Sequence, residues 1–328
     1  TAIGRIDVGA VPLSALTGAI GGESPPATLE RYRLEQARLL ARSPIGTVVQ
    51  VVFKNPGSAA SQTATLTTVD DAGQTFSLVN FAKRPALSDK VDYRILPEGY
   101  GYILVRMEVD LIPGTDQPAP GYPAGVFQRF REAITSFVAA GVPGVIVDLR
   151  GNYGGSDELA ADMCGFFYAA PSFYEYQEYY DKRTGRFLRI TLDEHNLNPF
   201  VDHISIDPQT PRFSGPVVVL VNPGTTSSGE GPAMGIARLP QGSVIGFHGT
   251  NGSFGMTGGE LPMPGGYKIK YPFGRSVDKN GVIQLDSRNG IGGVAPNPRV
   301  PKTLENVLAF AAGTDVELQY AIRYLRGY

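Results

Sequence analysis

The chain has 328 residues, of which 42% are hydrophobic and 18% charged, and this composition supplies a sizeable core for about two domains. The formal net charge of −2 indicates no basic surface for nucleic acid, and no apolar run is long enough to span a membrane. Cys164 is the one cysteine, which excludes a disulfide within the chain. It lies in an apolar run, which predicts a buried, inert thiol.

Residues 1–98 predict a small, mainly β module. Thr28 is a candidate N-cap for a helix that follows it. Residues 47–53 and 63–69 are rich in β-branched side chains and flank the turn at 55–57, a pattern that predicts a hairpin. The hairpin resembles the second half of a PDZ domain, a module that binds peptide carboxylates by strand addition. A generic β module is the alternative interpretation.

Residues 99–328 predict a second domain of the α/β class. It opens with a strand at 100–108, which a loop rich in proline and glycine separates from an amphipathic helix at 126–140. A buried strand then runs from 144 to 148 into a glycine-rich turn, and a helix is expected from 157 to 168. Strands that alternate with helices in this way predict a parallel sheet.

Three glycines lie within five residues of the turn after the strand at 144–148: Gly151, Gly154 and Gly155. Such a density implies positive φ angles or a close approach of the backbone to another group.

Residues 171–213 are rich in aromatic side chains, and His195 and His203 lie among them. The pattern predicts a strand pair and a long loop. Two interpretations stay open: a lid or substrate wall, or an aromatic surface excursion that packs on the core.

A second strand-to-helix turn carries two serines. Residues 217–221 form a continuous aliphatic run that predicts a strand buried on both faces. Ser227 and Ser228 follow it, just before a helix that begins near Glu230. A hydroxyl placed there lies beside unpaired backbone N–H groups, as a nucleophilic serine requires. The alternative is that one of the serines is only an N-cap. If the two turns follow neighbouring strands, they form a crevice at one edge of the sheet.

The rest of the chain predicts a strand around Val244, hairpins within 260–296, and helices at 304–308 and 316–325.

Four segments together resemble the carboxy-terminal processing (tail-specific) serine proteases. Residues 148–155 are similar to the family's DLRxNxGG motif and residues 225–230 to its TxSxxE turn. Residues 244–253 are similar to VGxxTxG, and residues 293–297 to a late GIxPD segment. The resemblance covers about residues 99–328 and implies a crotonase-like spiral ββα core after the PDZ-like module.

The resemblance implies a serine endopeptidase that forms an acyl-enzyme on extended or C-terminal peptide segments. We expect a peptide or protein substrate, no cofactor, no metal, and a periplasmic or secreted location, although no signal peptide is visible. The histidines show no metal-ligand spacing.

The same resemblance assigns roles to individual residues. Ser227 is the expected nucleophile, and the oxyanion hole consists of N–H groups from Gly154 or Gly155 and from Ser228. Glu230 has a supporting place, at the active site or at the helix N-terminus. Asp148 and Arg150 are expected to form a structural ion pair.

The general base is not evident. Many relatives have a lysine where this chain has Ser253, so a serine–lysine dyad is not supported, and Asp286 is the acid nearest to the family's late glutamate. We therefore expect the histidine-type, tricorn-core-like branch, with the base on an upstream segment or chain. The alternatives are that His248 serves as the base, or that the protein is an inactive peptide-binding scaffold. An esterase ranks last, because the turn lacks a glycine two residues before Ser227.

Overall fold

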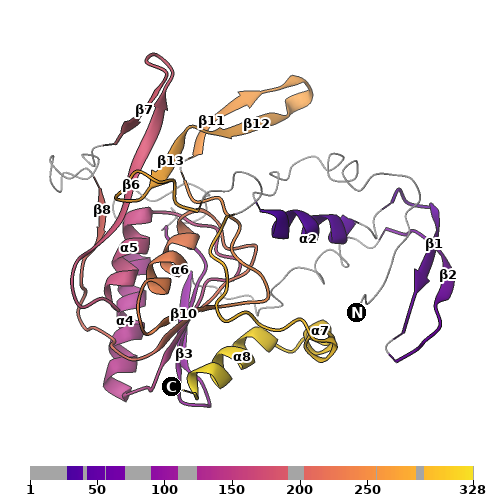
Figure 1. Cartoon of the computed structure of the whole chain (residues 1–328), viewed down its shortest axis with the longest axis horizontal. Helices are drawn as coiled ribbons and strands as arrows, with labels where there is room; N and C mark the ends of the chain where they lie inside the picture. Colours follow the sequence, from indigo (N-terminus) through magenta and orange to yellow (C-terminus); the bar gives the residue numbers. More distant parts are fainter. Residues whose placement is uncertain are drawn as a thin grey trace.

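The computed structural model describes residues 28–39, 43–55, 57–70, 90–109, 124–190, 203–255, 257–285 and 292–327. Figure 1 shows the chain coloured along its sequence. The predictions for Asp286 and His195 fall outside the described residues. Among the described residues, no helix combines the length and the apolar character needed to cross a bilayer.

A five-stranded sheet with the order β10-β9-β5-β4-β3 forms the centre of the structure. Its strands are β3 (Val91–Ile95), β4 (Gly101–Val105), β5 (Val145–Asp148), β9 (Val217–Leu220) and β10 (Gly242–Ile245). β3 is antiparallel to β4, and the other neighbours are parallel. The strands expected at 144–148, 217–221 and around 244 are confirmed. Because β5 and β9 are parallel neighbours, their two turns leave the same edge of the sheet.

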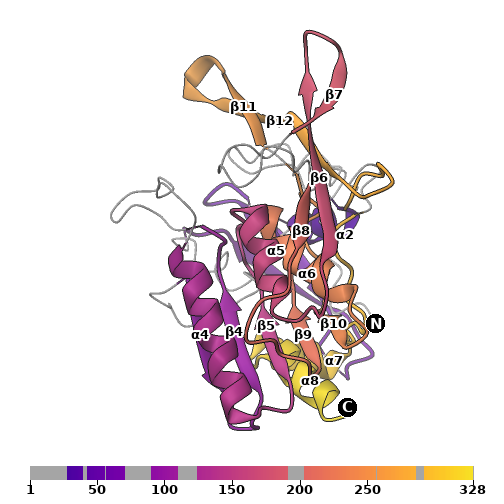
Figure 2. The ribbon, with the colours of Figure 1, turned by 90° about the vertical axis from the view of Figure 1, so that its left-hand side faces the viewer.

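Helices cover both faces of this sheet (Figure 2). One face packs against α4 (Ala124–Ala140), α5 (Asp157–Gly165) and α6 (Glu230–Ala237). The other packs against α8 (Val316–Leu325), with α7 (Leu304–Ala311) beside it. These helices confirm those expected from the sequence, and the result is a mixed α/β fold.

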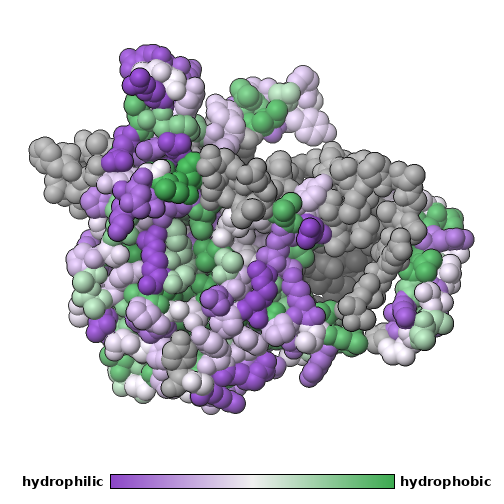
Figure 3. All heavy atoms as spheres, in the orientation of Figure 1, coloured by the Kyte–Doolittle hydropathy of each residue, from purple (hydrophilic) through white to green (hydrophobic). Residues whose placement is uncertain are grey.

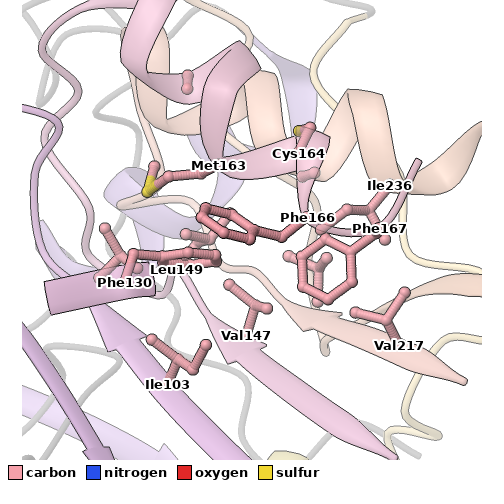
Figure 4. Packing of buried hydrophobic residues seen from close by; sticks show 14 of the residues in the cluster. Ile103, Phe130, Val147, Leu149, Met163, Cys164, Phe166, Phe167, Val217 and Ile236 are labelled. Atoms are coloured by element: carbon pink, nitrogen blue, oxygen red, sulfur yellow. The ribbon is translucent and has the colours of Figure 1, made fainter. Parts of the chain in front are cut away.

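Successive strand residues alternate between the two cores. Val147 and Val217 lie under α4 to α6, together with Phe166 and Phe167 (Figure 4), whereas Ile146 lies on the α8 face. All five are 0–1% exposed. Burial of such side chains contributes about 1.5–3 kcal/mol each, so the central strands are the most firmly fixed part of the fold.

A smaller antiparallel sheet and a separate hairpin extend from one end of the molecule (Figures 1 and 2). The sheet consists of β6 (Ser172–Asp181), β7 (Arg186–Arg189), β8 (Ile204–Ile206) and β13 (Gly274–Val277). The hairpin consists of β11 (Thr257–Pro262), η2 (Pro264–Gly266) and β12 (Lys268–Pro272). The strand pair expected in 171–213 is confirmed as β6–β7, and its role as a lid stays a prediction. Apolar side chains on the β11–β12 hairpin are exposed, as Figure 3 shows in green, and include Leu261 and Ile269.

The N-terminal part contains α2 (Leu29–Leu39) and a hairpin of β1 (Val48–Phe53) and β2 (Gln62–Thr67). Thr28 caps α2, because its Oγ1 accepts the N–H of Arg31 at 3.1 Å. The predicted helix and hairpin are therefore confirmed, but a hairpin alone does not establish a PDZ-like module. The division into 1–98 and 99–328 stays a prediction. β3 lies on the N-terminal side of that boundary, yet it pairs with β4 of the central sheet.

Candidate active site

Ser227 occupies a strained position at the turn after β9. Its φ angle is +54°, in the left-handed region that non-glycine residues seldom adopt. It begins the short 3₁₀ helix η1 (Ser227–Gly229), which continues directly into α6. Such strain in a turn is typical of functional sites, where the surrounding structure holds the residue in place.

Neither serine caps the helix with its side chain. Thr226 precedes η1 and Gly229 precedes α6, and no side-chain capping bond is made at either position. The Ser228 hydroxyl instead donates to the carbonyl oxygen of Gly155 at 2.9 Å. The N-cap interpretation of these serines is therefore wrong, because Thr226 and Gly229 occupy the N-cap positions.

The glycine turn after β5 lies directly against the serine turn. Gly154 has φ +89°, and a Cβ on it would lie 2.7 Å from the Cβ of Ser227 and 3.0 Å from the N of Ser228. A Cβ on Gly155 would lie 2.4 Å from the backbone of Glu108. These distances require glycine at both positions. The two turns that the sequence placed at one sheet edge are thus in contact.

Two N–H groups remain available at this contact. Gly154 donates its N–H to Asn152 Oδ1 at 2.7 Å, so Gly154 is not a free donor. The N–H of Gly155 has no acceptor within the described residues. Ser228 is the second residue of η1, where a helical N–H has no partner inside the helix. The candidate oxyanion donors are therefore Gly155 and Ser228.

Asn152 connects the turns, and the sequence analysis gave it no role. Its backbone oxygen accepts the N–H of Thr226 at 2.9 Å. Its Nδ2 donates to Glu108 Oε1 at 2.6 Å and to Val105 O at 3.1 Å. Burial raises the pKa of Glu108 to about 8 despite the bond from Asn152. The only sequence signal was the asparagine in the motif at 148–155.

Glu230 organises the loop beside the serine turn. Its buried carboxylate accepts bonds from the Thr250 hydroxyl at 2.5 Å and the Gly252 N–H at 2.8 Å. It also accepts from Ser253, at 2.6 Å through N–H and at 3.2 Å through Oγ. Burial raises the pKa of Glu230, although the four hydrogen bonds act in the opposite direction. Ser253 Oγ in turn accepts the N–H of Ser227 at 3.3 Å, so Glu230 fixes the serine turn through Ser253.

His248 lies before this loop and contacts the N-terminal helix α2. Its Nδ1 lies 2.8 Å from Glu30 Oε1 and 3.2 Å from Lys302 Nζ. Glu30 Oε2 also accepts the N–H of Gly249 at 2.9 Å. These contacts hold His248 and Gly249 against α2. The role of His248 as the base stays a prediction.

A buried ion network connects the glycine turn to the start of α8. Arg150 bonds Asp148, the strand residue beside it, and also Asp315 and Glu317 at the start of α8. Glu317 Oε1 accepts the N–H of Phe247 at 2.8 Å. The structural role expected for the Asp148–Arg150 pair agrees with these contacts, which fasten the turn to α8.

Comparison with known proteins supports the resemblance carried by these motifs. The family described as Peptidase family S41 matches residues 122–299, more than half of the chain. The chain belongs to peptidase family S41. No curated protein sequence matches it.

Solved structures resemble this S41 chain in fold. A candidate peptidase from Parabacteroides merdae has 17% identity and a TM-score of 0.51, covering 90% of this chain and 82% of its own. Mature CPAF complexed with lactacystin has 12% identity and a TM-score of 0.56, and the match covers 99% of this chain and 78% of the CPAF chain. A mutant of CPAF has 11% identity and a TM-score of 0.58, covering 95% and 74%. At these identities the likeness shows the fold alone.

The remaining candidates in this S41 chain lie outside the contact of the two turns. Cys164 is buried, and burial raises its pKa to about 12, as expected for an inert thiol. His203 stacks on Phe173 of β6 with ring centroids 5.6 Å apart. Within the described ranges, no group of three or more His, Cys, Asp or Glu could hold a metal ion.

Proposed function

We propose that this S41 chain carries the catalytic serine of an endopeptidase that resembles the C-terminal processing proteases. The observation that carries the proposal is Ser227, held at φ +54° with the backbone of Gly154 pressed against it. This arrangement presents a hydroxyl beside two unused N–H groups, which is the geometry that acyl transfer requires.

The proposed reaction uses the two turns together. A base removes the proton of Ser227 Oγ while the oxygen bonds to the carbonyl carbon of a peptide. The carbonyl oxygen takes the electron pair and accepts hydrogen bonds from the N–H groups of Gly155 and Ser228. The oxyanion then returns its electron pair to the carbon, the C–N bond breaks, and the protonated base gives its proton to the leaving amine. Water afterwards hydrolyses the acyl-enzyme and frees Ser227 Oγ. One such donor contributes on the order of 10²–10³ in rate.

The position of α2 supports a base supplied from upstream. A Cβ on Gly252 would lie 2.7 Å from the methyl carbon of Thr28, and Gly252 precedes Ser253. Thr28, the N-cap residue of α2, therefore lies close to the loop behind Ser227. Residues 1–27 contain neither histidine nor lysine. The proposed base is thus a histidine on a segment before this sequence or on another chain, as in the histidine-type branch.

Three finer predictions accompany the proposal. The central sheet is proposed to belong to a crotonase-like spiral core, and the β1–β2 hairpin to a PDZ-like module that binds substrate C-termini. Substrates are proposed to be extended or C-terminal peptide segments outside the cytoplasm. The overall likeness to the CPAF structures supports the first of these.

The test is covalent labelling of the complete protein, including any segment that precedes Thr1, with a fluorophosphonate. The expected result is one adduct on Ser227, with no adduct on Ser227→Ala. Lactacystin is a second probe, since it was bound to mature CPAF. The matched control is Ser58→Ala, at a half-buried serine near the β1–β2 hairpin, and it should label as fast as the wild type. Peptide binding without any adduct on Ser227 would identify the protein as a non-catalytic binder.

A further inference from the structure

Two acidic side chains from different elements meet behind the oxyanion site. Asp157 is the first residue of α5, two residues after Gly155, and Glu175 lies on β6. The side-chain amide of Gln177 donates to Asp157 Oδ2 at 2.8 Å and to Glu175 Oε1 at 2.9 Å. The two acids are also hydrogen-bonded to each other. We call Asp157 and Glu175 the carboxyl pair.

A local irregularity of β6 turns Glu175 inward. The pairing of β6 with β8 shifts register between Phe173 and Glu175. A bulge of this kind breaks the alternation of faces along a strand. Tyr174 and Glu175 are consecutive, yet they are 0% and 1% exposed. The strand therefore places a carboxyl in the interior where regular pairing would direct it outward.

The carboxyl pair lies next to the proposed oxyanion donors. Asp157 follows Gly155 by two residues, and the backbone oxygen of Gly155 accepts the Ser228 hydroxyl at 2.9 Å. Asp157 is thus connected to Ser228 through the backbone of Gly155. Through Glu175, the same connection reaches β6, which continues into the projecting β6–β7 hairpin (Figure 1).

Two ionised carboxylates cannot hydrogen-bond each other, because both are acceptors only. One proton between them turns repulsion into a strong, charge-assisted bond. Asp157 is partly exposed and Glu175 is not, so the proton lies on Glu175 and Asp157 accepts it. Burial raises the pKa of Asp157 to about 6 and raises that of Glu175 well above its ordinary value.

Apart from one histidine, the other titratable groups around the carboxyl pair are of types that never carry a positive charge. They are Glu158 and Cys164 on α5, Tyr174 on β6 and Glu108 after β4. His203 stacks on aromatic rings of β6. The negative groups oppose loss of the shared proton.

The cations on neighbouring elements have other acceptors. Arg238, after α6, donates to the backbone oxygen of a β6 residue and to Gln284. Arg275 of β13 bonds Glu178 at 2.7 Å, and Arg189 of β7 lies over an aromatic ring of β6.

We propose that Asp157 and Glu175 are positioning residues that share one proton and thereby hold Ser228, a donor of the oxyanion site, against β6. The proposal rests on the proposed function for the role of Ser228, but the shared proton itself does not. Loss of the proton places two charges together, which separates α5 from β6 and moves Ser228.

The first test measures the pH dependence of unfolding in the full chain. A group whose pKa is raised in the folded state stabilises the fold at low pH, and this stability is lost as pH rises through the folded pKa. Each proton that only the folded state retains changes the unfolding equilibrium tenfold per pH unit. Above pH 6, Glu175→Gln should lower this dependence by one proton, while Glu108 contributes equally to both proteins.

The second test measures the rate at which a fluorophosphonate labels Ser227 in the complete protein at pH 7. Glu175→Ala removes the donor to Asp157 and should slow labelling at least about tenfold, corresponding to a misplaced oxyanion donor. Glu175→Gln restores a donor through its amide and should recover the rate. Glu178→Gln, on the same strand, is the matched control and should behave as the wild type.

Two outcomes overturn the proposal: an unchanged pH dependence in Glu175→Gln, or equally slow labelling of Glu175→Gln and Glu175→Ala. Should Glu175→Gln not fold, Asp157→Asn is measured in its place, because it also keeps one donor between the two side chains. If no protein is labelled at any pH, the proposed function fails, whereas the unfolding measurement still decides whether the carboxyl pair shares a proton.

Discussion

Replacing Gly154 with alanine should separate the two turns that form the site. The backbone at Gly154 has φ +89°, where an L-residue costs about 1–2 kcal/mol. The new Cβ would lie 2.7 Å from the Cβ of Ser227. Carbon atoms in ordinary contact are about 3.5–4.0 Å apart, so one turn has to move by roughly 1 Å. A displacement of that size costs about 10²-fold in rate.

Gly151 is the matched control in the same turn. Its φ is +72°, but a Cβ there would meet nothing within 4 Å. Gly151→Ala therefore introduces the same backbone strain without the clash. Gly151→Ala should lose about 1–2 kcal/mol of unfolding free energy in denaturant titrations, and Gly154→Ala should lose more, because the clash adds to the backbone strain.

The deciding assay is the rate of fluorophosphonate labelling per folded molecule of the complete protein. Gly154→Ala should label about 10²-fold more slowly than the wild type, and Gly151→Ala at nearly the wild-type rate. Equal rates in the two variants would refute the inference that contact between the turns shapes the site.

Three further changes test the supports of the site. The Glu230 carboxylate accepts four hydrogen bonds, and Glu230→Gln would place an N–H donor opposite some of these donors. The variant should lose about 1–3 kcal/mol of unfolding free energy in denaturant titrations. Arg150→Met leaves the buried carboxyl groups of Asp148 and Glu317 without their cation and should cost about 3–5 kcal/mol, with a lower melting temperature. Burial would raise the pKa of Glu30, but its bonds to His248 and Gly249 and nearby Arg299 lower it to about 2. Its stabilising contribution is therefore present above about pH 4.5 and lost as pH falls towards 2, a dependence that Glu30→Gln should weaken in unfolding curves.

The strands and turns around the serine could be predicted because their signals are local. Residues 145–148 and 217–220 are continuous aliphatic runs, and glycines or serines follow each of them directly. Such runs become central parallel strands, whose carboxyl ends lie at one edge of the sheet. The contact between the turns then followed from topology.

The residues that hold the turns in place could not be predicted, because their partners are distant in sequence. Asn152 and Glu108 are 44 residues apart, and Glu30 and Gly249 are 219 apart. Neither residue type nor periodicity indicates such pairs. The inward position of Glu175 depends on a bulge, which interrupts the alternation that sequence interpretation assumes. The N-cap interpretation failed because it considered the helix without the glycine turn beside it.

The helix α2 packs against the loop behind Ser227, although none of its described residues reacts in the proposed mechanism. Glu30 holds the backbone at Gly249, and Thr28 lies against Gly252. A truncation that removes this helix would therefore keep Ser227 but remove the contacts that hold the loop at 249–252 in place. Removal of residues 28–39 should therefore slow labelling of Ser227 although both turns keep their sequence.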